Sequence, residues 1–169
     1  TKPAVRAAGG VVVSQHGAAS RAGARVLEAG GNAVDAAVVT ALVGGVVEPW
    51  LSGLGGGGFL VTFDPRDGTS HALDFGMVAS RHLDPADYPL ADAHSGAAGL
   101  FAWPAVQDDR NLRGPHACGV PGSVAGFAAA LERLGTLAWS DALEPAAAAA
   151  EAGLTVDAYT TLSVATAAE

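Results

Sequence analysis

Cysteine and aromatic residues are scarce in this sequence. Cys118 is the only cysteine among 169 residues, so neither an intrachain disulfide nor a multi-cysteine metal site is available, and the redox compartment stays undetermined. Aromatic residues make up 6%, whereas half of the chain is hydrophobic and 23 residues are glycine. This composition excludes a disordered tail, a collagen-like repeat and a disulfide-rich miniprotein. We expect one domain over residues 1–169 with a core of alanine, valine and leucine.

Basic residues are also few. Nine lysines and arginines stand against seventeen aspartates and glutamates, which gives a net charge of -8. This balance argues against binding to nucleic acid or to an anionic membrane surface. The longest apolar run, residues 33–47, contains Asp35 and is typical of a buried helix, not of a membrane span. No signal peptide is visible, so the cytoplasm is slightly favoured, with a secreted or periplasmic protein whose signal was removed as the alternative.

Hydrophobic patterning predicts a mixed α and β fold. Residues 10–14 are a β-branched run typical of a buried strand, and residues 20–29 predict a helix. Asn32 is suited to cap a second helix over residues 33–43. Asp35 follows Asn32 by three residues, where a capping box places a carboxylate, so we interpret Asp35 as structural rather than catalytic.

The strands of this chain are too few for a complete sheet. Residues 59–63 and 70–75 predict a hairpin, because a proline and an Asp-Gly pair lie between them. Residues 77–116 show no sustained period and predict a long irregular segment that lines a site. Further helices are expected over residues 124–134, over residues 146–152 with Pro145 in the first turn, and from about Asp157 onward.

Several motifs invite a functional interpretation that the pattern does not support. The glycine cluster at residues 53–58 lacks the Lys-Ser/Thr of a phosphate-binding loop and precedes a strand, so it predicts a turn packed against neighbouring backbone. Cys118 has no evident base beside it and is interpreted as a buried structural thiol. The five histidines lack the spacing of metal ligands: His16, His71, His82, His94 and His116. The carboxylates of Asp84, Asp108 and Asp109 are interpreted as solvated rather than catalytic. We expect no metal, no cofactor and no catalytic residue in this chain.

The order of motifs nevertheless resembles one family closely. The chain reads Ser-Gln-His-Gly-Ala-Ala-Ser from Ser14, Gly-Gly-Asn-Ala-Val-Asp-Ala-Ala from Gly30, and Val-Val-Glu-Pro from Val46. It continues with Ser-Gly-Leu-Gly-Gly-Gly-Gly-Phe from Ser52 and Cys-Gly-Val-Pro-Gly from Cys118. This series resembles the γ-glutamyltranspeptidase family over nearly the whole chain.

The resemblance implies an N-terminal nucleophile hydrolase, in which a precursor cuts itself into a large and a small chain that together form an αββα sandwich. This chain would be a partial large subunit, and its partner would be the small catalytic chain of the same precursor. The nucleophile of the family is the threonine freed at the start of the small chain. Thr1 lies upstream of the motifs, and Thr160-Thr161 lies where the family has an ordinary helix, so neither is interpreted as that nucleophile.

One departure from the family pattern bears on the substrate. In glutamyl-specific members the Asp-Phe or Asp-Gly pair at the end of the strand that we predict over residues 70–75 is followed by Arg-Glu, and the arginine binds the glutamyl α-carboxylate. Here Phe75 is followed by Gly76 and Met77. Phe75, Gly76 and Met77 are therefore the candidate substrate-binding residues, with Arg81 as a replacement cation.

The resemblance and this departure together imply a self-processing amidohydrolase or acyltransferase. Its small-molecule amide or acyl substrate would lack the usual glutamyl handle, as in acylases of the cephalosporin type. Three alternatives stay open. They are a relative that cleaves an acyl or carbon–carbon bond in antibiotic and other natural-product biosynthesis, a true γ-glutamyl transferase or hydrolase, and a non-catalytic binding module.

Overall fold

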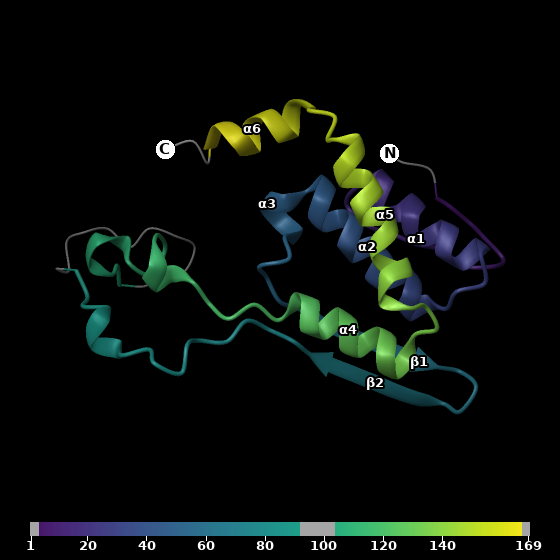
Figure 1. The fold of residues 1–169 in the computed structure, drawn as a ribbon, viewed down its shortest axis with the longest axis horizontal. Coiled ribbons are helices and arrows are strands. Elements are labelled where there is room, and N and C mark those ends of the chain that lie inside the picture. Colours follow the sequence, from purple (N-terminus) through teal and green to yellow (C-terminus); the bar gives the residue numbers. More distant parts are fainter. Residues whose placement is uncertain (1–3, 92–103, 167–169) are drawn as a thin grey trace. The chain divides into compact units, whose positions relative to one another are not determined.

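The structure is a computed structural model that describes residues 4–91 and 104–166. The chain forms two compact units, one made of Thr1–Gly76 with Gly122–Glu169 and the other of Met77–Pro121. Figure 1 shows the helices and the hairpin of the first unit. The expectation of a single domain over residues 1–169 stays a prediction.

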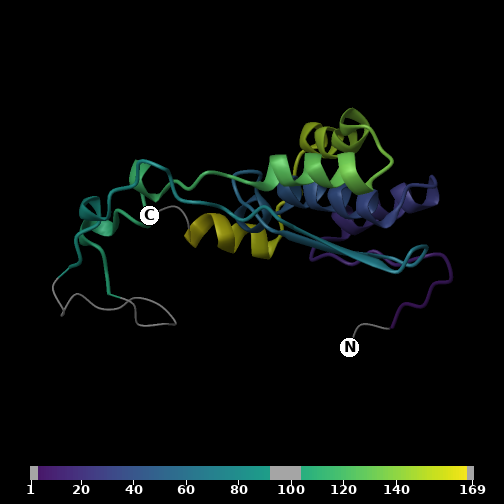
Figure 2. The ribbon, with the colours of Figure 1, turned by 90° about the horizontal axis from the view of Figure 1, so that it is seen from below.

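Helix α2 (Ala33–Val47) is the centre of the first unit. Its buried residues lie on every side, and Val38 and Val39 are fully buried, because α1 (Gly17–Glu28) and α5 (Trp139–Ala152) both pack on it. Figure 2 shows these helices layered above the hairpin. The helix runs four residues beyond the predicted end, since burial of Val47 keeps the last turn helical.

A buried carboxylate ties the start of α2 to the turn between α4 (Ser123–Leu134) and α5. Asp35 Oδ2 accepts from the Asn32 backbone N–H at 2.8 Å and from the Thr136 hydroxyl at 2.6 Å. Asp35 Oδ1 accepts from the backbone N–H groups of Thr136 and Leu137 at 2.8 and 3.1 Å. The predicted capping box is confirmed, and its acid also joins two segments about a hundred residues apart.

The predicted hairpin is also confirmed. Strands β1 (Phe59–Asp64) and β2 (Thr69–Asp74) pair antiparallel, and they are the two strands of the sheet within the described ranges. Leu60 and its partner Leu73 pack against the core. Phe59, Val61 and Phe63 alternate with Leu60 and lie on the other face, 75%, 78% and 60% exposed. The β1 half of this face is therefore apolar and is not covered by the described residues, whereas its β2 half carries Ser70, Ala72 and Asp74.

Two predictions about local structure were wrong. Helix α5 begins at Trp139 rather than at Pro145, because Ala142 and Ala146, one turn apart, are buried against α2 and extend the helix upstream across the proline. Residues 10–14 are not a buried strand. They have no strand partner in the part of the chain that the structure describes, and Val11 and Val13 are exposed while Val12 packs against the core.

The remaining elements are short or peripheral. Helix α3 (Pro49–Ser52) follows α2 directly, and α6 (Ala158–Thr166) begins where Asp157 accepts a hydrogen bond from the Thr160 N–H at 2.7 Å, as predicted. The second unit is irregular, as expected, with 3-10 turns η1 (Pro85–Asp87), η2 (Gln107–Asp109) and η3 (Pro115–Ala117). No helix among the described residues is long and apolar enough to cross a membrane.

We expect Asp35→Asn to destabilise the first unit by about 2–3 kcal/mol. The asparagine amide keeps one uncharged oxygen acceptor, and its NH₂ group, a donor, replaces the other oxygen and faces N–H or O–H donors that need an acceptor. Urea unfolding followed by circular dichroism measures the loss. Asp141→Asn is the control, since Asp141 is exposed in the first turn of α5. Equal stabilities of the two variants would contradict this role for Asp35.

The same carboxylate predicts acid sensitivity. Burial by itself would raise the pKa of Asp35, but the hydrogen bonds from Thr136, Asn32 and Leu137 outweigh it and hold the pKa below its ordinary value of 3.8. The stabilisation is present above pH 3.8 and is lost as the pH falls through the lowered pKa. The urea midpoint of the wild type should therefore fall between pH 5 and pH 3 by more than that of Asp35→Asn. Parallel pH profiles would contradict the assignment.

Candidate functional site

The end of β2 holds Phe75 in a fixed position. Phe75 and Gly58 exchange backbone hydrogen bonds of 3.0 and 3.3 Å, which continue the hairpin ladder past Asp74. The Phe75 ring packs edge-on against Phe127 of α4, with 5.6 Å between ring centroids. It also covers Gly126, where a Cβ atom would overlap the ring. Glycine at position 126 is therefore what allows α4 to approach the hairpin this closely.

Gly76 follows with room for a side chain. Its N–H donates to Asp74 Oδ1 at 3.0 Å. A Cβ atom at Gly76 would lie 3.3 Å from the same oxygen and 3.9 Å from the Phe59 ring, so only a small adjustment would be needed. The backbone at Gly76 is not in the left-handed region. The backbone geometry thus does not require glycine here, and a Cβ atom needs only a small shift of the Asp74 carboxylate.

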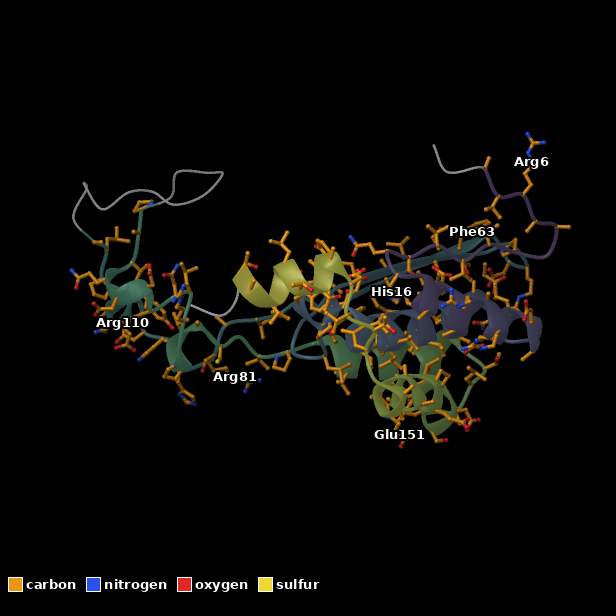
Figure 3. The ribbon with its side chains drawn as sticks, turned by 90° about the horizontal axis from the view of Figure 1, so that it is seen from above. Arg6, His16, Phe63, Arg81, Arg110 and Glu151 are labelled. Atoms are coloured by element: carbon orange, nitrogen blue, oxygen red, sulfur yellow. The ribbon has the colours of Figure 1, made fainter. Side chains whose placement is uncertain are left out.

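Met77 and Arg81 belong to the second unit. Met77 is 62% exposed and lines a hollow of about 580 Å³ together with His82, Tyr88 and His116. Arg81 is exposed and has no ion-pair partner among the residues described; Figure 3 shows its side chain extending from the ribbon. Of the four candidate substrate-binding residues, Phe75 and Gly76 lie in one unit and Met77 and Arg81 in the other. Substrate binding by all four stays a prediction.

A larger cavity of about 900 Å³ lies in the first unit, along one side of α2. We call it the α2 groove. Residues 11–15 and the glycine loop at 53–58 line its walls, and Phe75 and Phe127 also line it. Its floor is a face of α2 made of small residues: Ala33, Ala36, Ala37, Thr40, Ala41 and Gly44.

Sequence reasoning missed the α2 groove, although a signal for it was present. Small residues recur along α2 at helical spacing from Ala33 to Gly44, and a buried helix uses such a face where backbone approaches it closely. The glycine loop behaves as predicted, since the Gly56 carbonyl accepts from the N–H groups of Gly122 and Ser123 at 2.9 and 3.1 Å. Glu48 is the only charged side chain lining the groove within the described ranges.

The other titratable residues singled out from the sequence lie in several separate elements of the described chain. Asp84 accepts from the Ala86 N–H at 2.9 Å and caps η1. No group of three or more potential metal ligands occurs in residues 4–91 and 104–166, and His94 lies outside these ranges. The prediction of a buried thiol was wrong, because Cys118 sits in the loop after η3 and is exposed. Thr160 is buried inside α6, and Thr1 lies outside the described residues.

Comparison with known proteins gives consistent matches. The family described as Gamma-glutamyltranspeptidase matches residues 19–169. A "Glutathione hydrolase proenzyme" of Pseudomonas aeruginosa is 37% identical over 88% of this chain and 24% of its own length. An "Acylase ACY 1 proenzyme" of Pseudomonas sp. (strain SE83) is 37% identical over 89% of this chain and 26% of its own length. The chain therefore spans about a quarter of the length of these curated relatives.

A solved structure agrees. The γ-glutamyltranspeptidase from Pseudomonas nitroreducens complexed with L-DON superposes with a TM-score of 0.81 at 33% sequence identity, over 96% of this chain and 44% of that chain. At this identity and coverage the likeness extends to both sequence and fold.

The packing around Phe75 predicts the effect of a single methyl group. In Gly126→Ala the new Cβ atom overlaps the Phe75 ring, and overpacking of this kind costs about 1–3 kcal/mol, against about 1 kcal/mol gained in helix propensity. Because the overlap is with the ring itself, we expect the upper end of that cost, about 3 kcal/mol, and a net loss of about 2 kcal/mol in urea unfolding. Gly9→Ala is the control, since no atom lies within 4 Å of its Cβ position. A Gly126→Ala variant as stable as the control would show that α4 does not hold Phe75.

Proposed function

The chain belongs to the γ-glutamyltranspeptidase family, and on that premise we propose that it is the N-terminal part of the large chain of a self-processing N-terminal nucleophile hydrolase. The catalytic threonine would stand at the start of a small chain cut from the same precursor. This chain would contribute no catalytic residue of its own and would help to position that small chain and the substrate. The two chains together would complete an αββα sandwich.

The unpaired backbone edges of the first unit are the observation that supports the proposal of a partner chain. The outer edge of β1 and the extended residues 11–14 have no strand partner in the parts of the chain that are described. Unpaired strand edges are typical sites for the addition of further strands. The exposed apolar face of Phe59, Val61 and Phe63 is the kind of surface that a second sheet covers. About three quarters of a relative's length lies beyond the matched region, which is ample for such a partner.

The proposed reaction is acyl transfer through the threonine. Its hydroxyl oxygen attacks the acyl carbon of the substrate, and its α-amine takes up the hydroxyl proton. The bond from the acyl carbon to nitrogen then breaks, and that proton passes to the departing amine. Water adds to the resulting ester, releases the acid and restores the threonine hydroxyl.

The substrate we propose is an amide whose acyl group lacks the α-carboxylate of a glutamyl residue. Gly76 stands where glutamyl-specific members carry an arginine, and losing the cation that pairs with a buried carboxylate costs about 2–5 kcal/mol of recognition. The acylase among the relatives is as similar to this chain as the glutathione hydrolase, 37% identical in both cases. This equality leaves both substrate classes open, and the preference for an acylase rests on the residue at position 76.

A panel of anilides tests this proposal in the complete protein. We expect the wild type to cleave glutaryl or simple acyl anilides with a higher kcat/KM than a γ-glutamyl anilide. Gly76→Arg should raise the kcat/KM for the γ-glutamyl anilide relative to the acyl anilides by about tenfold or more, because it restores a cation for the carboxylate. A Cβ atom at position 76 needs only a small shift of the Asp74 carboxylate, and Gly76 is not in the left-handed region.

Gly76→Gln is the matched control for the panel. It adds a shorter, uncharged polar side chain, so its substrate preference should stay close to that of the wild type. A wild type that prefers the γ-glutamyl anilide would contradict the proposed substrate class, and equal effects of the two substitutions would contradict the role of charge.

A further inference from the structure

Gly122, the residue just before α4, lies against the peptide that joins Phe75 to Gly76. A Cβ atom at Gly122 would overlap the Phe75 carbonyl oxygen, and it would lie 2.8 Å from the Phe75 carbonyl carbon and 3.2 Å from the Gly76 carbonyl oxygen. The atoms that it would meet all belong to the backbone of these two residues. A side chain at position 122 is therefore incompatible with the present position of this peptide.

Close approach alone calls for glycine at this position. Gly122 has φ -107° and ψ -18°, a right-handed backbone conformation that is open to other residues. Its conformational freedom is thus not used. What matters is the absence of a side chain, which lets the end of β2 lie on the start of α4.

Hydrogen bonds to the glycine loop hold both partners of this contact. The Gly56 carbonyl accepts from the Gly122 N–H at 2.9 Å, and the Phe75 carbonyl accepts from the Gly58 N–H at 3.3 Å. An added methyl group must therefore strain one of these two bonds. The bond to Phe75 is the longer and hence the weaker of the two, so we expect the 75–76 peptide to move.

A displacement of this peptide reaches position 76 directly. The peptide unit is planar and rigid, so the Cα atom of Gly76 moves with the Phe75 carbonyl group. The Gly76 N–H also donates to Asp74 Oδ1 at 3.0 Å, and this bond would be altered as well. A misplacement of about 1 Å at a residue that positions a substrate can cost about 100-fold in rate.

We infer that Gly122 is a positioning residue for position 76. Its missing side chain sets where the backbone of residue 76 stands relative to the acyl group of the substrate, so Gly122 contributes to substrate selectivity through Gly76. The inference rests on the proposed function, because it takes position 76 as part of the acyl-binding site.

The test uses the complete protein and the Gly76→Arg variant, in which the introduced arginine reports where residue 76 stands. Adding Gly122→Ala to this variant should lower the ratio of kcat/KM for the γ-glutamyl anilide to that for a simple acyl anilide by about fivefold or more. The loss should fall mainly on the KM for the γ-glutamyl anilide, because the arginine no longer meets its carboxylate. A loss of folded protein alone would lower both activities equally and leave the ratio unchanged.

Gly135→Ala is the matched control at the opposite end of α4. A Cβ atom there would lie 2.7 Å from Asp35 Oδ1 and 2.8 Å from the Leu131 Cα atom, so this methyl group also strains the first unit. In the Gly76→Arg background it should reduce stability and leave the ratio of the two kcat/KM values unchanged. Equal changes of the ratio in the two double variants would overturn the inference.

A measurement on the wild type does not depend on the folding of any variant. In a crystal structure of the complete protein with a slowly cleaved acyl amide bound, we expect backbone atoms of Gly76 within about 4 Å of the acyl group. Gly76 out of contact with the acyl group would overturn the inference even if Gly122→Ala failed to fold.

The outcomes separate this inference from the function beneath it. A Gly76→Arg variant that gains γ-glutamyl activity, and keeps the whole gain when Gly122→Ala is added, would overturn the inference and leave the proposed function intact. A complete protein that cleaves none of the anilides would overturn both.

Discussion

The hydrogen bonds accepted by the buried Asp35 carboxylate are the constraint on which the first unit depends. They join the start of α2 to Thr136 and Leu137 between α4 and α5, and thereby set the distance between these helices. Gly135 is part of this arrangement, since a Cβ atom there would lie 2.7 Å from Asp35 Oδ1. Helix α4 in turn holds the Phe75 ring, and α2 forms the floor of the groove. The candidate site is thus positioned by one carboxylate outside it.

Local signals in the sequence were sufficient to predict most of the helices and strands. The capping box at Asn32, the Asp-Gly turn of the hairpin and the glycine that ends α4 each act within a few residues, so their structure could be predicted. The start of α5 could not, because burial of Ala142 against α2 is a tertiary contact that overrides the local signal of Pro145. Asp35 was correctly interpreted as structural, but its bonds to Thr136 depend on the fold and leave no trace in the local pattern.

The candidate site was predictable only in part. The departure at Gly76 is predicted from the family resemblance and stays a prediction, whereas the contact that a Cβ atom at this position would make with Asp74 is a property of the folded chain. The run 10–14 has the composition of a strand without a partner strand in the described part of the chain. This fits the proposal that a second chain completes this fold. In that account this chain is a scaffold, and the substrate specificity of the enzyme follows from the absence of an arginine at position 76.

The central claim is that this chain belongs to a self-processed enzyme whose nucleophile is the first residue of a separate small chain. Intact mass measurement of every polypeptide in the purified complete protein, with N-terminal sequencing of each, tests it most directly. The account predicts two chains from one precursor, the smaller of which begins with threonine. A single uncut polypeptide, or a partner that begins with a residue unable to act as a nucleophile, would contradict it.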